Sequence, residues 1–240
     1  MMNLFVKGIT TATLTVMLGY LNSNLTASLA TFDLRQLLSS DSAIAQALIG
    51  QFALSTSSQD TLIIPGSRVG AVTSKSTRKD LVKLFGVSRL KDGSIYGAEG
   101  IGKFSVTRVN LGAEKSFTVV WSNNAKTKPI SVTDLGTAWK TPEGIGVGTS
   151  LTQLRQKLGE FKLFGLDWDY GGTVLLEKTK LSRYYGKLML QVEAAPNAAN
   201  KFPNDYRVVS GDQELSSTNP HWKPLGIRVG EISVVLSSSK

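Results

Sequence analysis

The chain has 240 residues, of which 41% are hydrophobic, and this composition predicts a folded core rather than a disordered polymer. The absence of cysteine excludes disulfides and thiolate chemistry, and the single histidine, His221, argues against histidine-based zinc sites and a histidine-dependent catalytic triad. The formal net charge of +9 favours acidic partners over basic ones.

Residues 1–30 have the layout of a secretory signal peptide. Lys7 is their only charged side chain, residues 8–21 are apolar or small, and Ser28 and Ala30 are small residues at the two positions that signal peptidase reads. The apolar run is too short and too rich in threonine for a comfortable membrane span. We therefore expect an extracytoplasmic protein, periplasmic or secreted, with no transmembrane segment in the mature chain.

Residues 31–60 are predicted to form an N-terminal helical segment and a linker. Between Leu34 and Phe52, apolar residues recur at the three- and four-residue spacing of one helix face. The polar residues 39–42 favour helix caps over helix interiors, and they would divide this segment into two short helices. Residues 55–60, STSSQD, then form the linker.

Residues 61–240 are predicted to form a single α+β domain built from an internal repeat. The segment TRKDLVKLFG, residues 77–86, aligns without a gap with SLTQLRQKLG, residues 150–159. In each copy the first hydroxyl residue can cap a helix, the acid or amide three residues later can complete a capping box, and the final glycine can supply a left-handed stop. We therefore expect repeat one to span residues 61–142 and repeat two to span residues 143–240.

Three segments with the pattern of β-strands follow each predicted helix. In these segments apolar and polar residues alternate, as they do in half-buried antiparallel strands. No long helical crossover, which a parallel sheet would need, separates them. These segments are residues 104–109, 116–121 and 129–135 in repeat one, and residues 173–178, 187–193 and 226–236 in repeat two. The expected fold class is thus α+β, with tandem helix-plus-three-strand repeats and antiparallel sheet, and residues 194–224 are expected to form a long loop.

Residues 67–92 are strongly basic, with a local net charge of +5. Long cationic side chains on the outer face of the helix at 77–86 would stay solvated and attract an anionic partner. The same charge could instead serve only as a solvated face that keeps the protein soluble. The candidate binding residues of this segment are Arg68, Arg78, Lys79 and Lys83.

The segment GLDWDYGG, residues 165–172, places two carboxylates and two large aromatics before a pair of glycines. We interpret it as the turn of a hairpin whose strands are LFGLDW and TVLLEK, in which Asp169 accepts amide hydrogen bonds and the glycines permit positive φ. On an extended strand Trp168 and Tyr170 would lie on one face, and Asp167 and Asp169 on the other. Trp168 and Tyr170 are therefore candidate binding residues.

Two other interpretations of this segment remain. Asp167-x-Asp169-x-Gly171 has the residue spacing with which a calcium-binding loop begins. Lys178 occupies the position of the bidentate glutamate of such a loop, so we expect no metal. Paired carboxylates two residues apart on a strand can also suit a glycosidase. The residues that would carry such catalysis are Asp167, Asp169, Glu99 and Glu177.

The segments PGSRVGAVT, GIGVGTSLTQL and GLDWDYGGTV resemble those of a group of uncharacterised exported bacterial proteins that share a GxRVG, GTSL and WDYGGT pattern. This resemblance covers residues 62–193 and implies no activity. The repeated capped helix with three strands is more distantly similar to the beta-lactamase-inhibitor and outer-membrane-assembly lipoprotein architectures, in which the sheet or its loops bind another protein. This chain lacks the cysteine that accepts lipid in those lipoproteins.

Together these features predict an exported, non-enzymatic binding protein of the cell envelope that uses no cofactor. Its expected partner is an envelope protein or an anionic polymer rather than nucleic acid, because an exported basic protein meets envelope components first. The alternative is a hydrolase that acts on envelope polysaccharide through paired carboxylates.

Cleavage after Ala30 would leave Thr31 at the amino terminus of the exported protein. Mass spectrometry of the native protein should therefore find a mature chain that begins at Thr31. An intact Met1 in the membrane fraction would contradict the signal-peptide prediction.

Overall fold

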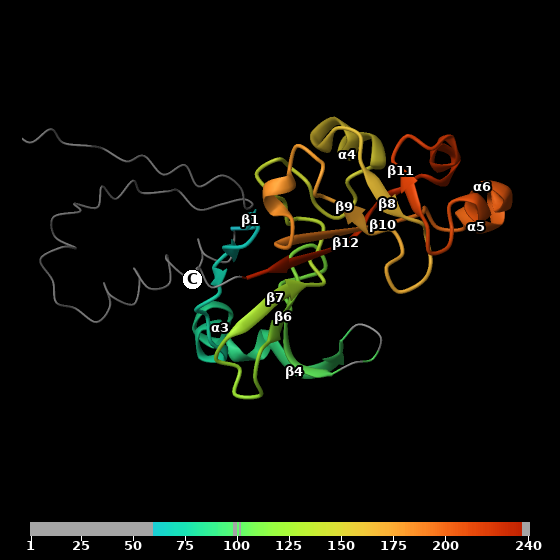
Figure 1. Ribbon diagram of the computed structural model, residues 1–240. Coiled ribbons are helices and arrows are strands. Elements are labelled where there is room, and N and C mark those ends of the chain that lie inside the picture. Colours follow the sequence, from blue (N-terminus) through green and yellow to red (C-terminus); the bar gives the residue numbers. More distant parts are fainter. Residues whose placement is uncertain (1–59, 98–99, 101, 237–240) are drawn as a thin grey trace, which may run out of the picture. The chain divides into compact units, whose positions relative to one another are not determined.

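The computed structural model describes residues 60–97, 100 and 102–236. The predicted signal peptide, the predicted helical segment at 33–53 and Glu99 lie outside the described residues. The described chain has an α+β fold that is mostly antiparallel sheet with few helices (Figure 1). No helix in this part of the chain is long and apolar enough to cross a membrane.

The main sheet has six strands in the order β10-β12-β7-β6-β5-β4. Every pair of neighbours in it is antiparallel. Strands β4 to β7 follow one another along the chain, whereas the last strand, β12, lies between β7 and β10 (Figure 1). The bounds are β4 Leu90–Tyr96, β5 Lys103–Val109, β6 Phe117–Trp121, β7 Pro129–Thr133, β10 Leu188–Glu193 and β12 Arg228–Val235.

Two smaller antiparallel sheets and several short helices complete the described chain. One sheet consists of β1 Ile63–Ile64, β2 Arg68–Val69 and β3 Val72–Thr73, and the other has the order β11-β8-β9, with β8 Lys162–Phe164, β9 Val174–Leu175 and β11 Glu214–Ser216. The α-helices are α3 Arg78–Phe85, α4 Leu151–Leu158, α5 Ala198–Lys201 and α6 Pro203–Val208. The 3₁₀-helices are η1 Val87–Arg89, η3 Ser182–Tyr184 and η4 Pro220–Leu225.

Both helices of the sequence alignment form with the predicted caps. The Thr77 side chain accepts a hydrogen bond from the Asp80 amide, and the Asp80 carboxylate accepts one from the Thr77 amide, which completes a capping box at the start of α3. Ser150 and Gln153 make the same pair of hydrogen bonds at the start of α4. The glycine that follows each helix has a φ of +82°, but its ψ is 145° at Gly86 and −160° at Gly159, so neither adopts the left-handed helical conformation that the sequence predicts.

The strands after the two helices differ from the three per repeat that the sequence predicts. The predicted strands after α3 form as β5, β6 and β7, but β4 precedes them, and its residues beyond Leu90 are all exposed. No apolar alternation marks such an edge strand in the sequence. After α4, the predicted strand at 173–178 shortens to β9, which pairs with β8 outside the main sheet.

The segment 194–224 is not the long irregular loop that its prolines and asparagines suggest. It contains α5, α6, β11 and most of η4. These elements are too short to show periodicity, but buried residues such as Trp222 anchor them. Trp222 donates its indole N–H to the Ser216 carbonyl at 2.9 Å, and His221 Nδ1 lies 2.8 Å from an Asp205 carboxylate oxygen.

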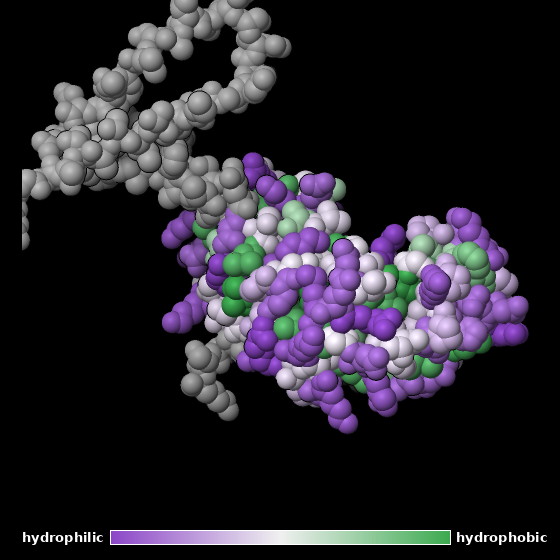
Figure 2. All heavy atoms as spheres, turned by 90° about the horizontal axis from the view of Figure 1, so that it is seen from above, coloured by the Kyte–Doolittle hydropathy of each residue, from purple (hydrophilic) through white to green (hydrophobic). Residues whose placement is uncertain are grey.

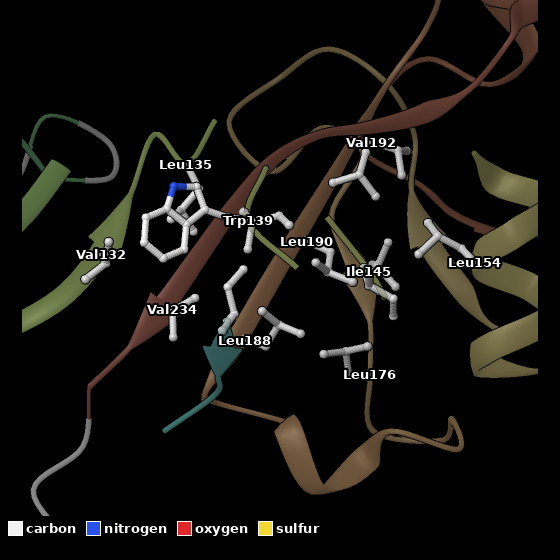
Figure 3. Close-up of a cluster of buried hydrophobic side chains, with 14 of the residues drawn as sticks. Val132, Leu135, Trp139, Ile145, Leu154, Leu176, Leu188, Leu190, Val192 and Val234 are labelled. Atoms are coloured by element: carbon white, nitrogen blue, oxygen red, sulfur yellow. The ribbon is translucent and has the colours of Figure 1, made fainter. Parts of the chain in front are cut away.

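The core is one cluster of buried apolar side chains that draws on the main sheet, the small sheets and the helices. Figure 3 shows a part of it, in which side chains of β7, β10, β12 and α4 lie together with side chains of the connecting loops, such as Trp139 and Ile145. Val132 of β7 and Val234 of β12 are fully buried and pair across the two strands. The Phe117 ring contacts Phe85 and Trp139 edge to face, at centroid distances of 5.6 and 5.3 Å, which joins α3 to the sheet.

Apolar side chains on the surface are scattered. The face of the described chain in Figure 2 carries mostly hydrophilic side chains, with apolar residues in small separate groups. The most exposed large apolar side chains among the described residues are Trp168 at 76%, Tyr96 at 70% and Val87 at 67%. Trp168, the largest of them, lies in the segment GLDWDYGG.

Leu154 of α4 is fully buried, and its truncation to alanine would remove apolar contacts and leave a cavity. We expect Leu154→Ala to lower the free energy of unfolding by about 2–5 kcal/mol in urea denaturation. Gln156→Ala, on the exposed face of the same helix, should change it by less than about 0.5 kcal/mol. Equal effects of the two variants would show that α4 does not pack on the core through this face.

Candidate functional site

The residues GLDWDYGG form the connection between β8 and β9. Leu163 pairs with Val174 in an antiparallel register, so the hairpin predicted from the sequence is confirmed. Strand β8 ends at Phe164, however, and the connecting loop therefore spans residues 165–173. This loop is wider than the tight DYGG turn expected from the glycine pair.

The backbone of the loop is left-handed at two residues that are not glycine. Asp167 has a φ of 65° and Trp168 a φ of 72°. An extended strand cannot pass through this conformation. The prediction that Trp168 and Tyr170 lie on one strand face, with Asp167 and Asp169 on the other, is therefore wrong.

Backbone hydrogen bonds hold the loop at its base. The Gly172 amide donates to the Gly165 carbonyl at 2.9 Å, which closes the loop. The Leu166 amide donates to the Val209 carbonyl at 2.7 Å, and the Gly211 amide donates to the Leu166 carbonyl at 2.9 Å. The loop is thus tied to the segment that follows α6.

Gly172 joins the loop to the main sheet and must be a glycine. Its φ is +71°, and a Cβ at this position would lie 2.1 Å from the carbonyl oxygen of Val192 in β10. The Val192 amide donates to the Gly172 carbonyl at 2.9 Å. The second glycine of the pair is therefore required by close packing as well as by its backbone angle.

A shallow pocket of about 200 Å³ lies in the loop. Its lining includes the aromatic residues Trp168 and Tyr170 and the carboxylates of Asp167, Asp169 and Asp212, but no lysine or arginine. Trp168 is 76% exposed and Tyr170 is 51% exposed. The loop therefore presents two aromatic side chains to solvent inside an acidic surround.

Asp212 is the pocket residue that sequence reasoning missed. It follows Gly211, whose backbone bond to Leu166 carries this segment to the loop. In the sequence an aspartate beside a glycine indicates a turn and not a binding site. Only the tertiary structure brings Asp212 to Asp167 and Asp169.

The carboxylates of the pocket differ in the hydrogen bonds that fix their positions. Asp167 accepts a hydrogen bond from the Tyr206 hydroxyl at 2.9 Å, and burial together with this carboxylate raises the pKa of Tyr206, so its hydroxyl stays a donor. The Asp169 carboxylate makes no hydrogen bond to a described residue, although the sequence predicts that it accepts amide bonds. The nearby Gly171 and Thr173 amides donate to backbone carbonyls instead.

The acids considered for catalysis do not form one group in the described chain. Asp167 and Asp169 line the pocket, whereas Glu177 follows β9 at the opposite end of the antiparallel hairpin. Glu99 lies outside the described residues. Within the described ranges, no cluster of three or more acidic, histidine or cysteine side chains is arranged to hold a metal ion.

The basic candidate residues differ in how freely their charges can act. Arg68 forms an ion pair with Asp60. Lys79 is exposed on α3, and the Lys83 side chain is 78% exposed. Of the four candidates, the two lysines are therefore the more exposed cations, and Lys83 lies 4.0 Å from an Asp80 carboxylate oxygen.

Arg78 belongs to a charged group that attaches α3 to the sheet. Its Nε lies 3.1 Å from an Asp92 carboxylate oxygen, the Lys126 ammonium lies 3.1 Å from the same oxygen, and the Thr107 hydroxyl donates to it at 2.6 Å. Burial tends to raise the pKa of Asp92, but the hydrogen bonds from Thr107, Arg78 and Lys126 outweigh it and lower the pKa to about 2. Arg78 thus has a structural partner already.

No protein-family model and no curated protein matches the chain. A solved structure similar to it, that of the uncharacterized protein yfeY from Escherichia coli, has 14% sequence identity and a TM-score of 0.41. The alignment covers 71% of this chain and 95% of that chain.

Trp168 can report on its own surroundings, because Trp121, Trp139 and Trp222 are at most 3% exposed. The carboxylates beside it should attract cations and repel anions although the whole chain carries a net charge of +9. We expect the ratio of the caesium to the iodide quenching constant to be higher for Trp168 than for free N-acetyltryptophanamide. The difference between the parent and Trp168→Phe isolates the Trp168 signal, and a ratio no higher than that of the free compound would contradict the acidic pocket.

Proposed function

We propose that this chain is a non-enzymatic binding protein of the cell envelope, and that the loop at residues 165–173 contacts its ligand. The observation that carries the proposal is the 76% exposure of Trp168 on a loop held by backbone hydrogen bonds. A ligand that covers the indole would bury a large apolar surface, and little conformational entropy would be lost because the loop is already held. Tryptophan and tyrosine are also common anchors of binding interfaces. The envelope location rests on the predicted signal peptide.

The charge of the pocket narrows the chemistry of the ligand. Asp167, Asp169 and Asp212 line it without a basic residue. An ammonium group would gain from these carboxylates and from the faces of Trp168 and Tyr170. We therefore propose a ligand with an ammonium group beside an apolar face, such as an amino sugar of an envelope polysaccharide.

Hydrolysis of envelope polysaccharide is the competing function. It needs two carboxyl groups held at a fixed separation across the glycosidic bond. The Asp169 carboxylate has no hydrogen bond to a described residue that would fix its position, and Glu177 lies at the other end of the hairpin. These two observations favour binding over catalysis.

We also propose a contact between the basic segment at residues 67–92 and an anionic partner. Lys79 and Lys83 support it, because they are exposed on α3 while Leu81 and Phe85 are buried on the other side of the helix. Attraction between these lysines and the partner would weaken as salt rises, since charges beyond about 8 Å are screened at physiological ionic strength.

The order of strand pairing supports a tandem architecture, which we propose in a revised form of one capped helix and four strands per unit, with β11 as an additional strand of the second unit. After α3, strands β4, β5, β6 and β7 each pair with the next. After α4, β8 pairs with β9, Thr173 beside β9 bridges to Gln191 of β10, and β10 pairs with β12. The last strands of the two units, β7 and β12, pair with each other.

The test of the loop site is a titration of the mature chain with choline, glucosamine and glucose. Choline and glucosamine should shift the Trp168 emission and bind more tightly than glucose. Trp168→Ala should lower their affinity by about tenfold or more in calorimetry, because it removes the aromatic anchor. Tyr185→Ala is the matched control, since Tyr185 is 62% exposed but does not line the pocket.

Two results would contradict the proposed function. Equal affinities for glucosamine and glucose would show that the carboxylates do not select a cation. Cleavage of an amino-sugar oligomer by the parent, lost in Asp169→Asn, would establish the hydrolase instead.

A further inference from the structure

A groove of about 570 Å³ lies between the start of α4, η4 and the start of β12. We call it the α4–η4 groove. Its lining comes from residues 148–155, 217–223 and 226–228. It shares no lining residue with the pocket of the 165–173 loop, so it is a separate candidate site.

The charge of the α4–η4 groove is positive throughout. Arg155, Lys223 and Arg228 line it, and no carboxylate does. Arg228 binds Glu193 through its guanidinium at 2.9 Å. Arg155 and Lys223 are exposed and form no ion pair with any described residue. Two uncompensated cations therefore border the same concave surface.

The positive charge of the groove is that of these side chains, and two of the first amides of α4 are already bonded within the protein. The Ser150 side chain accepts the Gln153 amide in the capping box. The Leu151 amide donates to the Ile227 carbonyl at 2.9 Å. Arg155 and Lys223 are therefore the charged groups through which we expect an anion to bind.

The groove also combines an apolar floor with a polar rim. Leu151, Trp222 and Ile227 line it and are at most 9% exposed. Thr152 is an exposed hydroxyl residue of the same lining. The Asn219 side-chain oxygen Oδ1 accepts a hydrogen bond from the His221 amide, which leaves the side-chain NH₂ group of Asn219 to donate to a ligand.

We propose that the α4–η4 groove binds an acidic saccharide, at a site independent of the 165–173 loop. The C–H faces of the sugar rings would lie on the apolar floor, the sugar hydroxyls would bond to Thr152 and Asn219, and the carboxylates would pair with Arg155 and Lys223.

Other anionic ligands match the groove less well. A bilayer presents its phosphates on a broad surface, whereas these cations border a concavity. Single-stranded nucleic acid stacks its bases on exposed aromatic rings, and the groove tryptophan, Trp222, is 2% exposed. An acidic saccharide uses the apolar floor, the rim donors and the cations together.

The test is a calorimetric titration of the mature chain with a galacturonate oligomer at low ionic strength. The double variant Arg155→Gln/Lys223→Gln should lower the affinity by about tenfold or more, because it removes two charge-assisted hydrogen bonds. Lys103→Gln/Lys128→Gln removes the same charge from two exposed lysines outside the groove and should leave the affinity unchanged. All of these residues are exposed, so thermal unfolding should show intact folds in both variants.

Further titrations distinguish binding of the acidic saccharide from binding of other anions. Inorganic phosphate, phosphatidylglycerol vesicles and a neutral maltose oligomer should each bind more weakly than the galacturonate oligomer. Arg155→Lys/Lys223→Arg keeps both charges and should retain most of the binding. Trp168→Ala should bind the oligomer as the parent does. Failure of the groove proposal can therefore be distinguished from failure of the proposed loop site.

Several outcomes would overturn the proposal. One is the absence of binding to the oligomer, and another is an equal loss in the two glutamine variants, which would make net charge a sufficient explanation. Binding of phosphate or of the vesicles as tightly as the oligomer would show a general anion site in place of a saccharide site.

Discussion

The insertion of β12 between β10 and β7 is the constraint on which the rest of the described structure depends. Without this strand, the β4–β7 meander and β10 would each end in an unpaired edge. A bulge sets its register, because Glu231 pairs with Gln191 and Val229 with Val192, which leaves Gly230 as an extra residue. The bulge keeps Val229 on the core face together with Ile232, and both are fully buried.

Both candidate sites depend on the two strands that this insertion brings together. The 165–173 loop packs on β10 through Gly172 and Val192, whose backbones are hydrogen-bonded at 2.9 Å. The start of β12 is bound to the residues around the start of α4, since the Val229 amide donates to the Thr149 carbonyl at 2.8 Å. The aromatic loop is thus held against the main sheet, and the α4–η4 groove forms where α4 meets β12.

The two sites are opposite in charge within one basic protein. All charged residues that line the loop pocket are aspartates, and all charged residues that line the groove are arginines or lysines. The basic segment at 67–92, which dominates the charge pattern of the sequence, uses part of its charge internally, as in the pairs of Arg68 with Asp60 and Arg78 with Asp92. A local net charge therefore locates a partner poorly, because it does not show which of the charges are held in ion pairs.

The sequence by itself determined the elements whose causes are local. The caps of α3 and α4 lie within a few residues of the helices. The strands β5, β6, β10 and β12 are indicated in the sequence by apolar residues, which lie in the core of the structure. It also predicted the hairpin around GLDWDYGG. Only the tertiary structure decided the exposed edge strand β4, the left-handed backbone of the loop, and the meeting of Asp212 with Asp167 or of Arg155 with Lys223. The meetings of Asp212 with Asp167 and of Arg155 with Lys223 depend on contacts between segments far apart in the chain, and the exposed strand β4 has no apolar alternation by which the sequence could show it.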